Sequence, residues 1–155
     1  MDASIINPFI AATAAVFKEM FGLDAAPDKP YVLEESSDSK WEISGLIGLA
    51  GAAQGIVAVR LPPGLAETLL GRTGMTFKTD DEKKQMVGGL VAELTNIVSG
   101  NAAGRFKDIN LDIAPPVVVR GDKHQISWPK IAPVLAVPMK TEAGSFELDV
   151  CFKGA

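Results

Sequence analysis

The sequence predicts an α+β fold in which two long helices and a short one pack on an antiparallel sheet. Two observations support this prediction. Apolar residues recur at helical spacing in two long segments, and in other segments they alternate with polar residues or glycine. The predicted order is long helix, hairpin, short helix, long helix, strands and hairpin. A chain of 155 residues has the usual size of one domain, so we expect a single domain over residues 1–155.

The first long helix is expected from Pro8 to Phe21. Asn7 is a good capping residue, and proline is favoured at the first helical position. Gly22 is expected to end this helix, and residues 24–30 are expected to form a linker because they hold two prolines in four positions. The apolar residues at helical spacing are Phe9, Ile10, Val16, Phe17, Met20 and Phe21.

The first hairpin is predicted at residues 41–61, with its turn at Gly51–Gln54. A short strand is expected before it, at residues 31–33, and a short helix after it, at residues 64–70. Part of the hairpin, residues 43–59, carries no charge. A membrane helix needs about 20 apolar residues, and four glycines weaken this shorter segment as a helix. We therefore interpret it as strands and not as a membrane span.

The second long helix is expected to begin after Thr79 and to end near Gly104. The Thr79 hydroxyl can cap the helix, and Glu82 stands three residues later, as in a capping box. The apolar stripe of this helix consists of Met86, Val87, Leu90, Val91, Leu94, Ile97 and Val98.

Strands are predicted again in the last third of the chain, at residues 109–113, 117–119, 131–139 and 145–152. Pro133 and Pro138 favour an edge or bulged position for the strand that contains them. In the last strand, Phe146 and every second residue after it should face one way, while Glu147, Asp149 and Cys151 face the other. Helix and hairpin thus occur twice, over residues 8–61 and 80–152, which suggests a pseudo-twofold repeat of elements.

Composition excludes several classes of function. The net charge is −4 and no basic run occurs, which argues against binding to nucleic acid or to an anionic membrane. With one cysteine and one histidine, the chain can form neither an internal disulfide nor an ordinary Cys/His metal site. Residues 1–7 lack the features of a signal peptide, so a cytoplasmic location is expected.

The common enzyme motifs are absent as well, including phosphate loops and the nucleophile elbow. His124 lies in a predicted polar loop beside Asp122 and Lys123, where a solvated histidine is expected more often than a catalytic one. Cys151 is interpreted as a small structural residue, because thiols stay reduced in the cytoplasm.

The polar side of the second long helix is the remaining candidate site. Glu93 and Asn96 project side by side, about 60° apart around the helix and about 4.5 Å apart along it. Gly89 precedes Glu93 by four residues and Gly100 follows Asn96 by four. This stripe could admit a partner close to the helix backbone. Spacing alone also fits two solvated side chains and glycines that serve packing.

The segment from Glu93 to Ala102, ELTNIVSGNA, resembles the ExxN signature of the CheC/CheX/FliY family of chemotaxis phosphatases. The Gly100-Asn101 pair is typical of the CheX branch, which carries a single ExxN. Further segments are similar to CheX proteins, and the likeness covers almost the whole chain. These segments are residues 6–10, 16–20, 114–118 and 144–148.

The resemblance implies a CheX-like fold and a phosphatase that acts on the phosphoaspartate of a CheY-like response-regulator receiver. It assigns Asn96 to orienting the attacking water and Glu93 to pairing with the receiver's active-site lysine. Gly89, Gly100 and Asn101 would contact the partner. The Mg²⁺ of the reaction would be supplied by the receiver, with no cofactor or metal on this chain. A homodimer is also implied, with residues 131–139 near an edge of the sheet.

Other readings stay open at this point. A CheX-like module could bind a receiver or another signalling protein without hydrolysing anything. A flagellar switch component of related fold fits less well, because no extra domain or partner-binding tail is evident. An enzyme for small molecules fits least, because no set of titratable residues converges.

Overall fold

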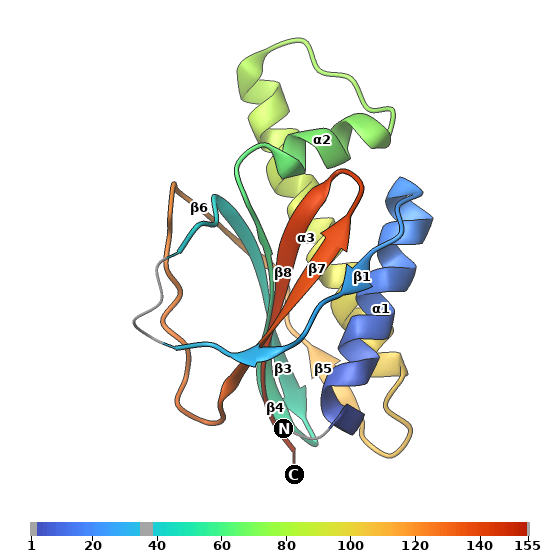
Figure 1. Ribbon diagram of the computed structural model, residues 1–155, viewed down its shortest axis with the longest axis vertical. Coiled ribbons are helices and arrows are strands. Elements are labelled where there is room, and N and C mark those ends of the chain that lie inside the picture. Colours follow the sequence, from blue (N-terminus) through green and yellow to red (C-terminus); the bar gives the residue numbers. More distant parts are fainter. Residues whose placement is uncertain (1–2, 35–38, 155) are drawn as a thin grey trace.

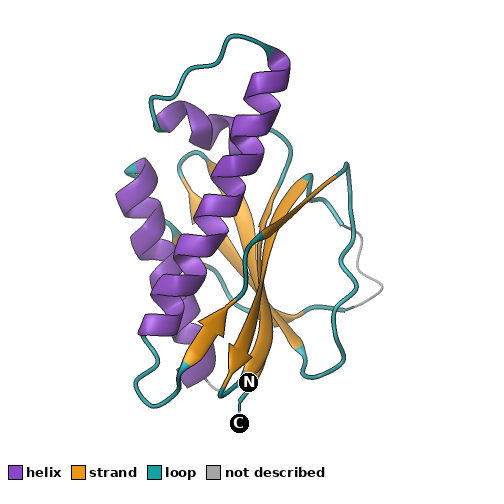
Figure 2. Cartoon of the chain, turned by 180° about the vertical axis from the view of Figure 1, so that it is seen from behind, coloured by secondary structure: helices purple, strands orange, loops and turns teal. Residues whose placement is uncertain are grey.

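The computed structural model describes residues 3–34 and 39–154. It consists of an antiparallel sheet with helices on one face. Helices α1 and α3 lie against that face, and α2 packs on α3 at one end (Figure 1, Figure 2). This arrangement confirms the predicted fold class. In chain order the elements are α1 (Ala3–Phe21), β1 (Ala26–Pro27), β2 (Tyr31–Val32), β3 (Ile43–Gly51), β4 (Gln54–Leu61), α2 (Leu65–Arg72), α3 (Asp80–Gly104), β5 (Leu111–Ile113), β6 (Val117–Arg120), β7 (Val134–Thr141) and β8 (Gly144–Lys153).

The sheet has the strand order β1-β7-β8-β4-β3-β5, with β2 also paired to β7 and β6 also paired to β3. Successive side chains alternate between its two faces, as the sequence predicts. The side chains on the helix face form the core together with α1 and α3. They include Ile43, Ile47, Val57, Val59, Leu61, Leu135, Val137, Phe146, Leu148 and Val150, all of them buried. The predicted pseudo-twofold repeat of elements stays a prediction.

Helix α3 begins and ends where the sequence predicts. The Thr79 hydroxyl accepts a hydrogen bond from the Glu82 amide at 3.1 Å, which caps the first turn. The Glu82 carboxylate accepts from the Lys78 amide at 3.2 Å, one residue earlier than in the predicted capping box. Five of the seven stripe residues are buried, and Met86 and Ile97 are half-buried. Burial of this stripe against the sheet therefore fixes which side of α3 faces outward.

Helix α1 begins at Ala3 and not at Pro8, so the predicted cap at Asn7 is wrong. Ile6 is buried, and Ile5 packs partly against the core, so burial of these two side chains favours an extra turn before the proline. Pro8 lies close enough to the start that the helix tolerates it. The short helix α2 also extends past the predicted end, because Gly71 lies inside it.

Strand β7 is not an edge strand, which corrects one of the two alternatives that its prolines favoured; the other, a bulged strand, stays a prediction. The strands β1 and β2 both pair with it on the side opposite β8. Pro138 lies between these two pairings and has no amide hydrogen to donate, and its carbonyl accepts from the Asp28 amide at 2.8 Å. The predicted linker at residues 24–30 therefore contains a short strand.

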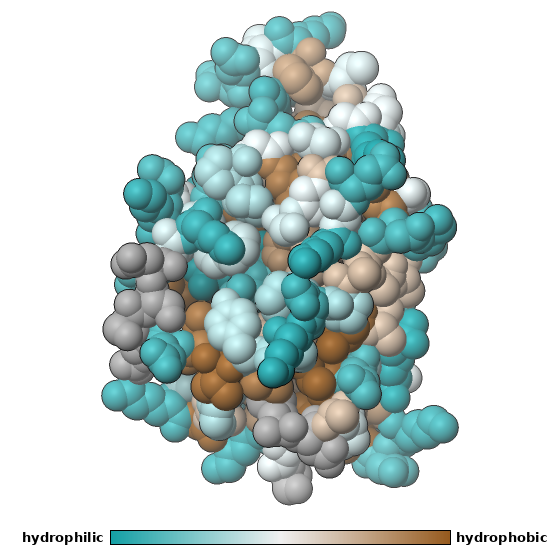
Figure 3. All heavy atoms as spheres, in the orientation of Figure 1, coloured by the Kyte–Doolittle hydropathy of each residue, from teal (hydrophilic) through white to brown (hydrophobic). Residues whose placement is uncertain are grey.

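The second face of the sheet is covered by a long segment that joins β6 to β7, residues 121–133, on the side away from the helices (Figure 1). Hydrophilic side chains cover most of the surface in Figure 3, and hydrophobic atoms show between them only in patches. None of the helices in the described parts of the chain has the length and apolar character of a membrane span.

Candidate functional site

The outward side of α3 carries both residues of the predicted pair. Glu93 is exposed and Asn96 is half-buried. Neither side chain forms a hydrogen bond or ion pair with the described residues. In a helix of this length the two side chains project about 60° apart and about 4.5 Å apart along the axis. The structure therefore leaves a carboxylate and an amide side by side, with their polar atoms unengaged within the described chain.

The glycines of this stripe leave the helix backbone accessible. Gly89 is exposed, and a methyl group added to it would meet no atom within 4 Å. At Gly100 the same methyl group would lie 3.7 Å from Ile113 Cδ1, which is an ordinary contact. Neither glycine is therefore required by packing inside the chain, so the predicted role in partner access is compatible with their surroundings.

Asn101 is not brought together with the pair. It lies about 140° around the helix from Asn96, and its amide oxygen accepts a hydrogen bond from Arg105 Nε at 2.7 Å. Its predicted contact with a partner stays a prediction.

Strands β5 and β6 flank the outward side of α3, which sequence reasoning missed. Ile113 of β5 lies beside Gly100, and Arg120 of β6 reaches Gly88, with its Nη1 3.7 Å from the position of an added methyl group. Ile113 and Val117 are exposed apolar side chains, with 36% and 60% exposure. Only the pairing of β5 and β6 with β3 places these residues near α3, and no local sequence signal predicts that pairing.

The pair can act chemically in two ways. A side-chain amide offers one acceptor and two donors without titrating, so Asn96 can hold and orient a water molecule. An exposed carboxylate can pair with a cation of a partner, which is the role that suits Glu93. Among the described residues, no group of three or more His, Cys, Asp or Glu side chains could hold a metal ion.

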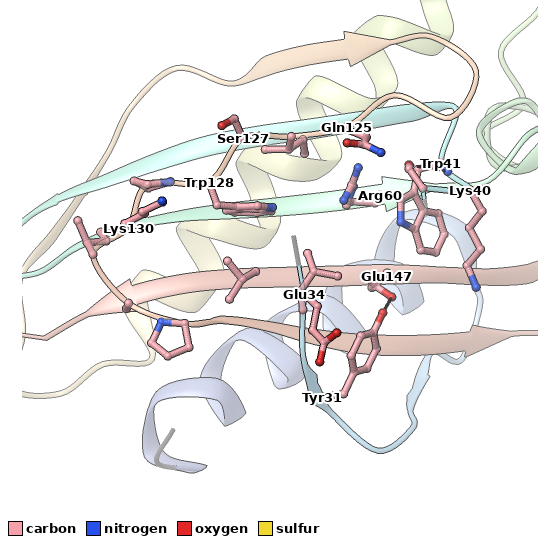
Figure 4. Close-up of a pocket in the computed structure, with 18 residues that line it drawn as sticks. Tyr31, Glu34, Lys40, Trp41, Arg60, Gln125, Ser127, Trp128, Lys130 and Glu147 are labelled. Atoms are coloured by element: carbon pink, nitrogen blue, oxygen red, sulfur yellow. Dashed lines mark hydrogen bonds between the residues drawn. The ribbon is translucent and has the colours of Figure 1, made fainter. Parts of the chain in front are cut away.

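A hollow of about 1020 Å³ lies on the opposite face of the sheet from α3, under residues 125–133 (Figure 4). We call it the far-face pocket. In Figure 4, Arg60 and Glu147 rise from neighbouring strands, and Trp128 comes from the covering segment. No local sequence pattern predicts this pocket, because its walls come from five separate segments. Its labelled lining residues are Tyr31, Glu34, Lys40, Trp41, Arg60, Gln125, Ser127, Trp128, Lys130 and Glu147.

The floor of the far-face pocket is a buried polar network. Arg60, 4% exposed, forms an ion pair with the fully buried Asp149, with Nη1 3.5 Å from Oδ2. Its Nε donates to Ser44 Oγ at 3.2 Å. The Tyr31 hydroxyl donates to Glu147 Oε2 at 2.6 Å. The prediction that Glu147, Asp149 and Cys151 face away from the helices is confirmed, but all three are buried because residues 121–133 cover them.

Burial controls the protonation of this network. Desolvation raises the pKa of Asp149 well above its ordinary value, and the neighbouring Glu147 raises it further, while Arg60 opposes the shift. Desolvation also raises the pKa of Tyr31, helped by its hydrogen bond to Glu147. Asp149 thus takes up a proton more readily than an exposed carboxyl group does, although it lies beside a guanidinium that is always charged.

His124 is not a solvated loop residue, which corrects the prediction. Its ring is half-buried, with Nε2 2.6 Å from Ser44 Oγ and Nδ1 3.0 Å from the Gly121 carbonyl oxygen. Arg60 Nη2 donates to its backbone carbonyl at 3.3 Å. His124 therefore ties the covering segment to β3 and β4.

Cys151 is buried, and its thiol contacts the carbonyl of Ala132 at 3.4 Å. Burial raises the pKa of this thiol, which disfavours the reactive thiolate. These observations agree with the structural role expected for it.

The comparisons with known proteins agree with the fold and with the family that the sequence resembles. Residues 43–140 match the family model described as chemotaxis phosphatase CheX. CheX of Desulfovibrio desulfuricans is similar to this chain with a TM-score of 0.85, at 29% identity with 97% of this chain and 99% of that chain covered. A chemotaxis protein of Desulfovibrio vulgaris Hildenborough has the same TM-score, at 31% identity with 97% of each chain covered. No curated protein matches the chain.

A third structure is the CheX–CheY–BeF3–Mg²⁺ complex of Borrelia burgdorferi. The similar chain in it is 24% identical, with 96% of this chain and 97% of that chain covered, and its TM-score is 0.79. At this identity the likeness concerns the fold.

Proposed function

The chain belongs to the CheX family of chemotaxis phosphatases, and from this membership we propose that it hydrolyses the phosphoaspartate of a CheY-like receiver. The observation that supports this most directly is the unengaged pair of Glu93 and Asn96 on the outward side of α3. The family sets the class of substrate, and the pair supplies groups that suit the reaction. That CheX of Borrelia burgdorferi forms a complex with CheY gives the proposal a precedent within the same fold.

In this proposal Asn96 positions the attacking water. An aspartyl phosphate is a reactive mixed anhydride, so its hydrolysis needs a water held in line more than it needs a protein nucleophile. The amide does this without a change of protonation. Phosphoryl transfer in small GTPases uses a glutamine amide for the same purpose. The Mg²⁺ that neutralises the phosphoryl oxygens would be held by the receiver.

Glu93 would dock the receiver by pairing with its active-site lysine. The carboxylate is exposed and free of partners within the described chain, so it need not break an internal ion pair before binding. Homodimerisation, which the resemblance implies, and a cytoplasmic location, which the sequence predicts, are further parts of this proposal.

The direct test mixes the protein with a receiver charged by acetyl phosphate and Mg²⁺ and follows the loss of phosphate over time. Turnover faster than the receiver's own decay supports the proposed function. Binding to the charged receiver without faster decay would contradict it and would favour a non-catalytic receiver-binding module.

Replacing Glu93 with alanine should weaken binding to a BeF3-activated receiver by about fivefold at low salt, and by less at high salt, because salt screens an exposed ion pair. Titration calorimetry at two ionic strengths measures this. Asp81→Asn is a matched control, since it removes the same charge from the same helix about 18 Å away. A loss that does not depend on salt would contradict pairing with a lysine.

Replacing Gly89 with leucine should block the receiver while leaving the chain folded, because the added side chain points into open space at the stripe. We expect loss of receiver dephosphorylation of about tenfold or more, with an unchanged circular dichroism spectrum. Gly104→Leu is the control, because Gly104 also has open space around it but lies at the end of α3. Full activity in Gly89→Leu would show that the receiver does not approach here.

A further inference from the structure

The turn of α3 that carries Glu93 and Asn96 packs directly on strand β3 at Gly45, a residue without a side chain. Gly45 is the third residue of β3 and lies on the face that α3 covers. A methyl group added to Gly45 would overlap Thr95 Oγ1, and it would lie 2.9 Å from Thr95 Cβ and 3.1 Å from the carbonyl oxygen of Val91. Real side chains do not approach so closely. The absence of a side chain at residue 45 is therefore required by the present position of α3.

Thr95 is held rigidly at this contact. It is fully buried, and its hydroxyl donates to the carbonyl oxygen of Val91 at 2.7 Å. Rotation of the Thr95 side chain does not move its Cβ, so a change of rotamer alone cannot relieve the overlap. Thr95 also stands between Glu93 and Asn96 in the sequence, in the same turn of α3. Any displacement at Thr95 is therefore passed to the two residues of the candidate site.

We propose that Gly45 is a positioning residue for Asn96: it lets Thr95 rest on β3, and this contact sets the height and rotation of the turn that presents Glu93 and Asn96. The inference rests on the proposed function of these two residues and adds a residue outside α3 on which turnover depends. Asn96 must hold water in line with a phosphoryl group on another protein, and misplacement of a catalytic group by about 1 Å can cost about 100-fold in rate. The docking surface is broader, with Ile113 and Arg120 beside α3, so binding should depend less on this contact.

The test compares the single variants Gly45→Ala, Thr95→Gly and Gly48→Ala with the double variant Gly45→Ala/Thr95→Gly. It measures receiver dephosphorylation at saturating receiver, affinity for the BeF3-activated receiver and thermal unfolding. Gly45→Ala should lower the maximal rate by about tenfold or more, and affinity by less than about threefold. The double variant Gly45→Ala/Thr95→Gly has room for the added methyl group and should recover most of the lost rate. Gly48→Ala is the matched control on the same strand, because its added methyl group meets only Ala114 Cβ at 3.7 Å.

A folded Gly45→Ala variant with the wild-type rate would overturn the inference. If Gly45→Ala alone does not fold, the double variant is compared with Thr95→Gly. A folded double variant that turns over the receiver supports the inference. A folded double variant without turnover, when Thr95→Gly alone is active, overturns it. Loss of rate and affinity together, with no recovery in the double variant, would indicate a general structural defect and count against positioning. If the wild-type protein turns over no receiver, the proposed function itself fails.

Discussion

Replacing Asn96 with alanine should lower receiver dephosphorylation by about 100-fold or more, which corresponds to about 2.7 kcal/mol of barrier height. The reason is that alanine removes the groups that would hold the attacking water, while the half-buried position on α3 is kept. Binding should be nearly unchanged, because docking is assigned to Glu93 and the surfaces around it. Phosphate loss from a charged receiver, measured under single-turnover conditions, gives the rate, and calorimetry gives the affinity.

Gln85→Ala is a suitable control for this experiment. Gln85 also bears an amide, is exposed, and lies on nearly the same side of α3, about three turns before Asn96. Removing its amide should leave the rate unchanged. Wild-type turnover in Asn96→Ala would refute the water-positioning role, whereas a parallel loss of affinity and rate would assign Asn96 to docking.

Replacing Arg60 with methionine should lower the free energy of unfolding by about 2 kcal/mol or more, because buried acceptors are left without a donor. Methionine fills similar space but offers no donor, so Asp149 Oδ2 and the carbonyl oxygen of His124 lose a hydrogen bond inside the protein. Chemical denaturation measures the change. Glu67→Gln is the control: it breaks the exposed Lys83–Glu67 pair, which is shorter at 2.9 Å but should contribute less than about 1 kcal/mol. Equal effects of the two substitutions would contradict the buried network as a stabilising feature.

The same network gives this stability a pH dependence. Because burial raises the pKa of Asp149, the folded chain keeps a proton that the unfolded chain releases. Asp149 therefore makes the free energy of unfolding fall as pH rises from about 4, the ordinary carboxyl pKa, to the raised value in the folded protein. Asp149→Asn should flatten the measured curve over this window, and an unchanged slope would show that Asp149 is ionised in the folded state.

Local patterns predicted the parts of the molecule that depend on local physics. The cap at Thr79, the apolar stripe of α3 and the alternation in β8 each follow from spacing and from helix or strand geometry. The outward orientation of Glu93 and Asn96 followed from the same stripe, because burying one side of a helix exposes the other. The predicted start of α1 was wrong because burial of Ile6 outweighed the capping preference of Asn7. That burial depends on the rest of the fold.

The remaining features could not be predicted because they depend on contacts between distant segments. Arg60 and Asp149 are 89 positions apart, and charged residues on alternate strand positions normally indicate a solvated face. Here a segment without regular structure covers that face and buries them. The contact between Gly45 and Thr95 is of the same kind, since a glycine in a strand has many possible reasons and only the position of α3 selects one of them.

Both tryptophans of the chain, Trp41 and Trp128, line the far-face pocket, on the opposite side of the sheet from α3. Indole emission from this protein consequently comes from one region only. Binding of a receiver to α3 should leave the emission of these two residues unchanged, whereas detachment of the covering segment should change it. Tryptophan fluorescence should therefore report detachment of the segment over the far-face pocket without responding to binding at α3.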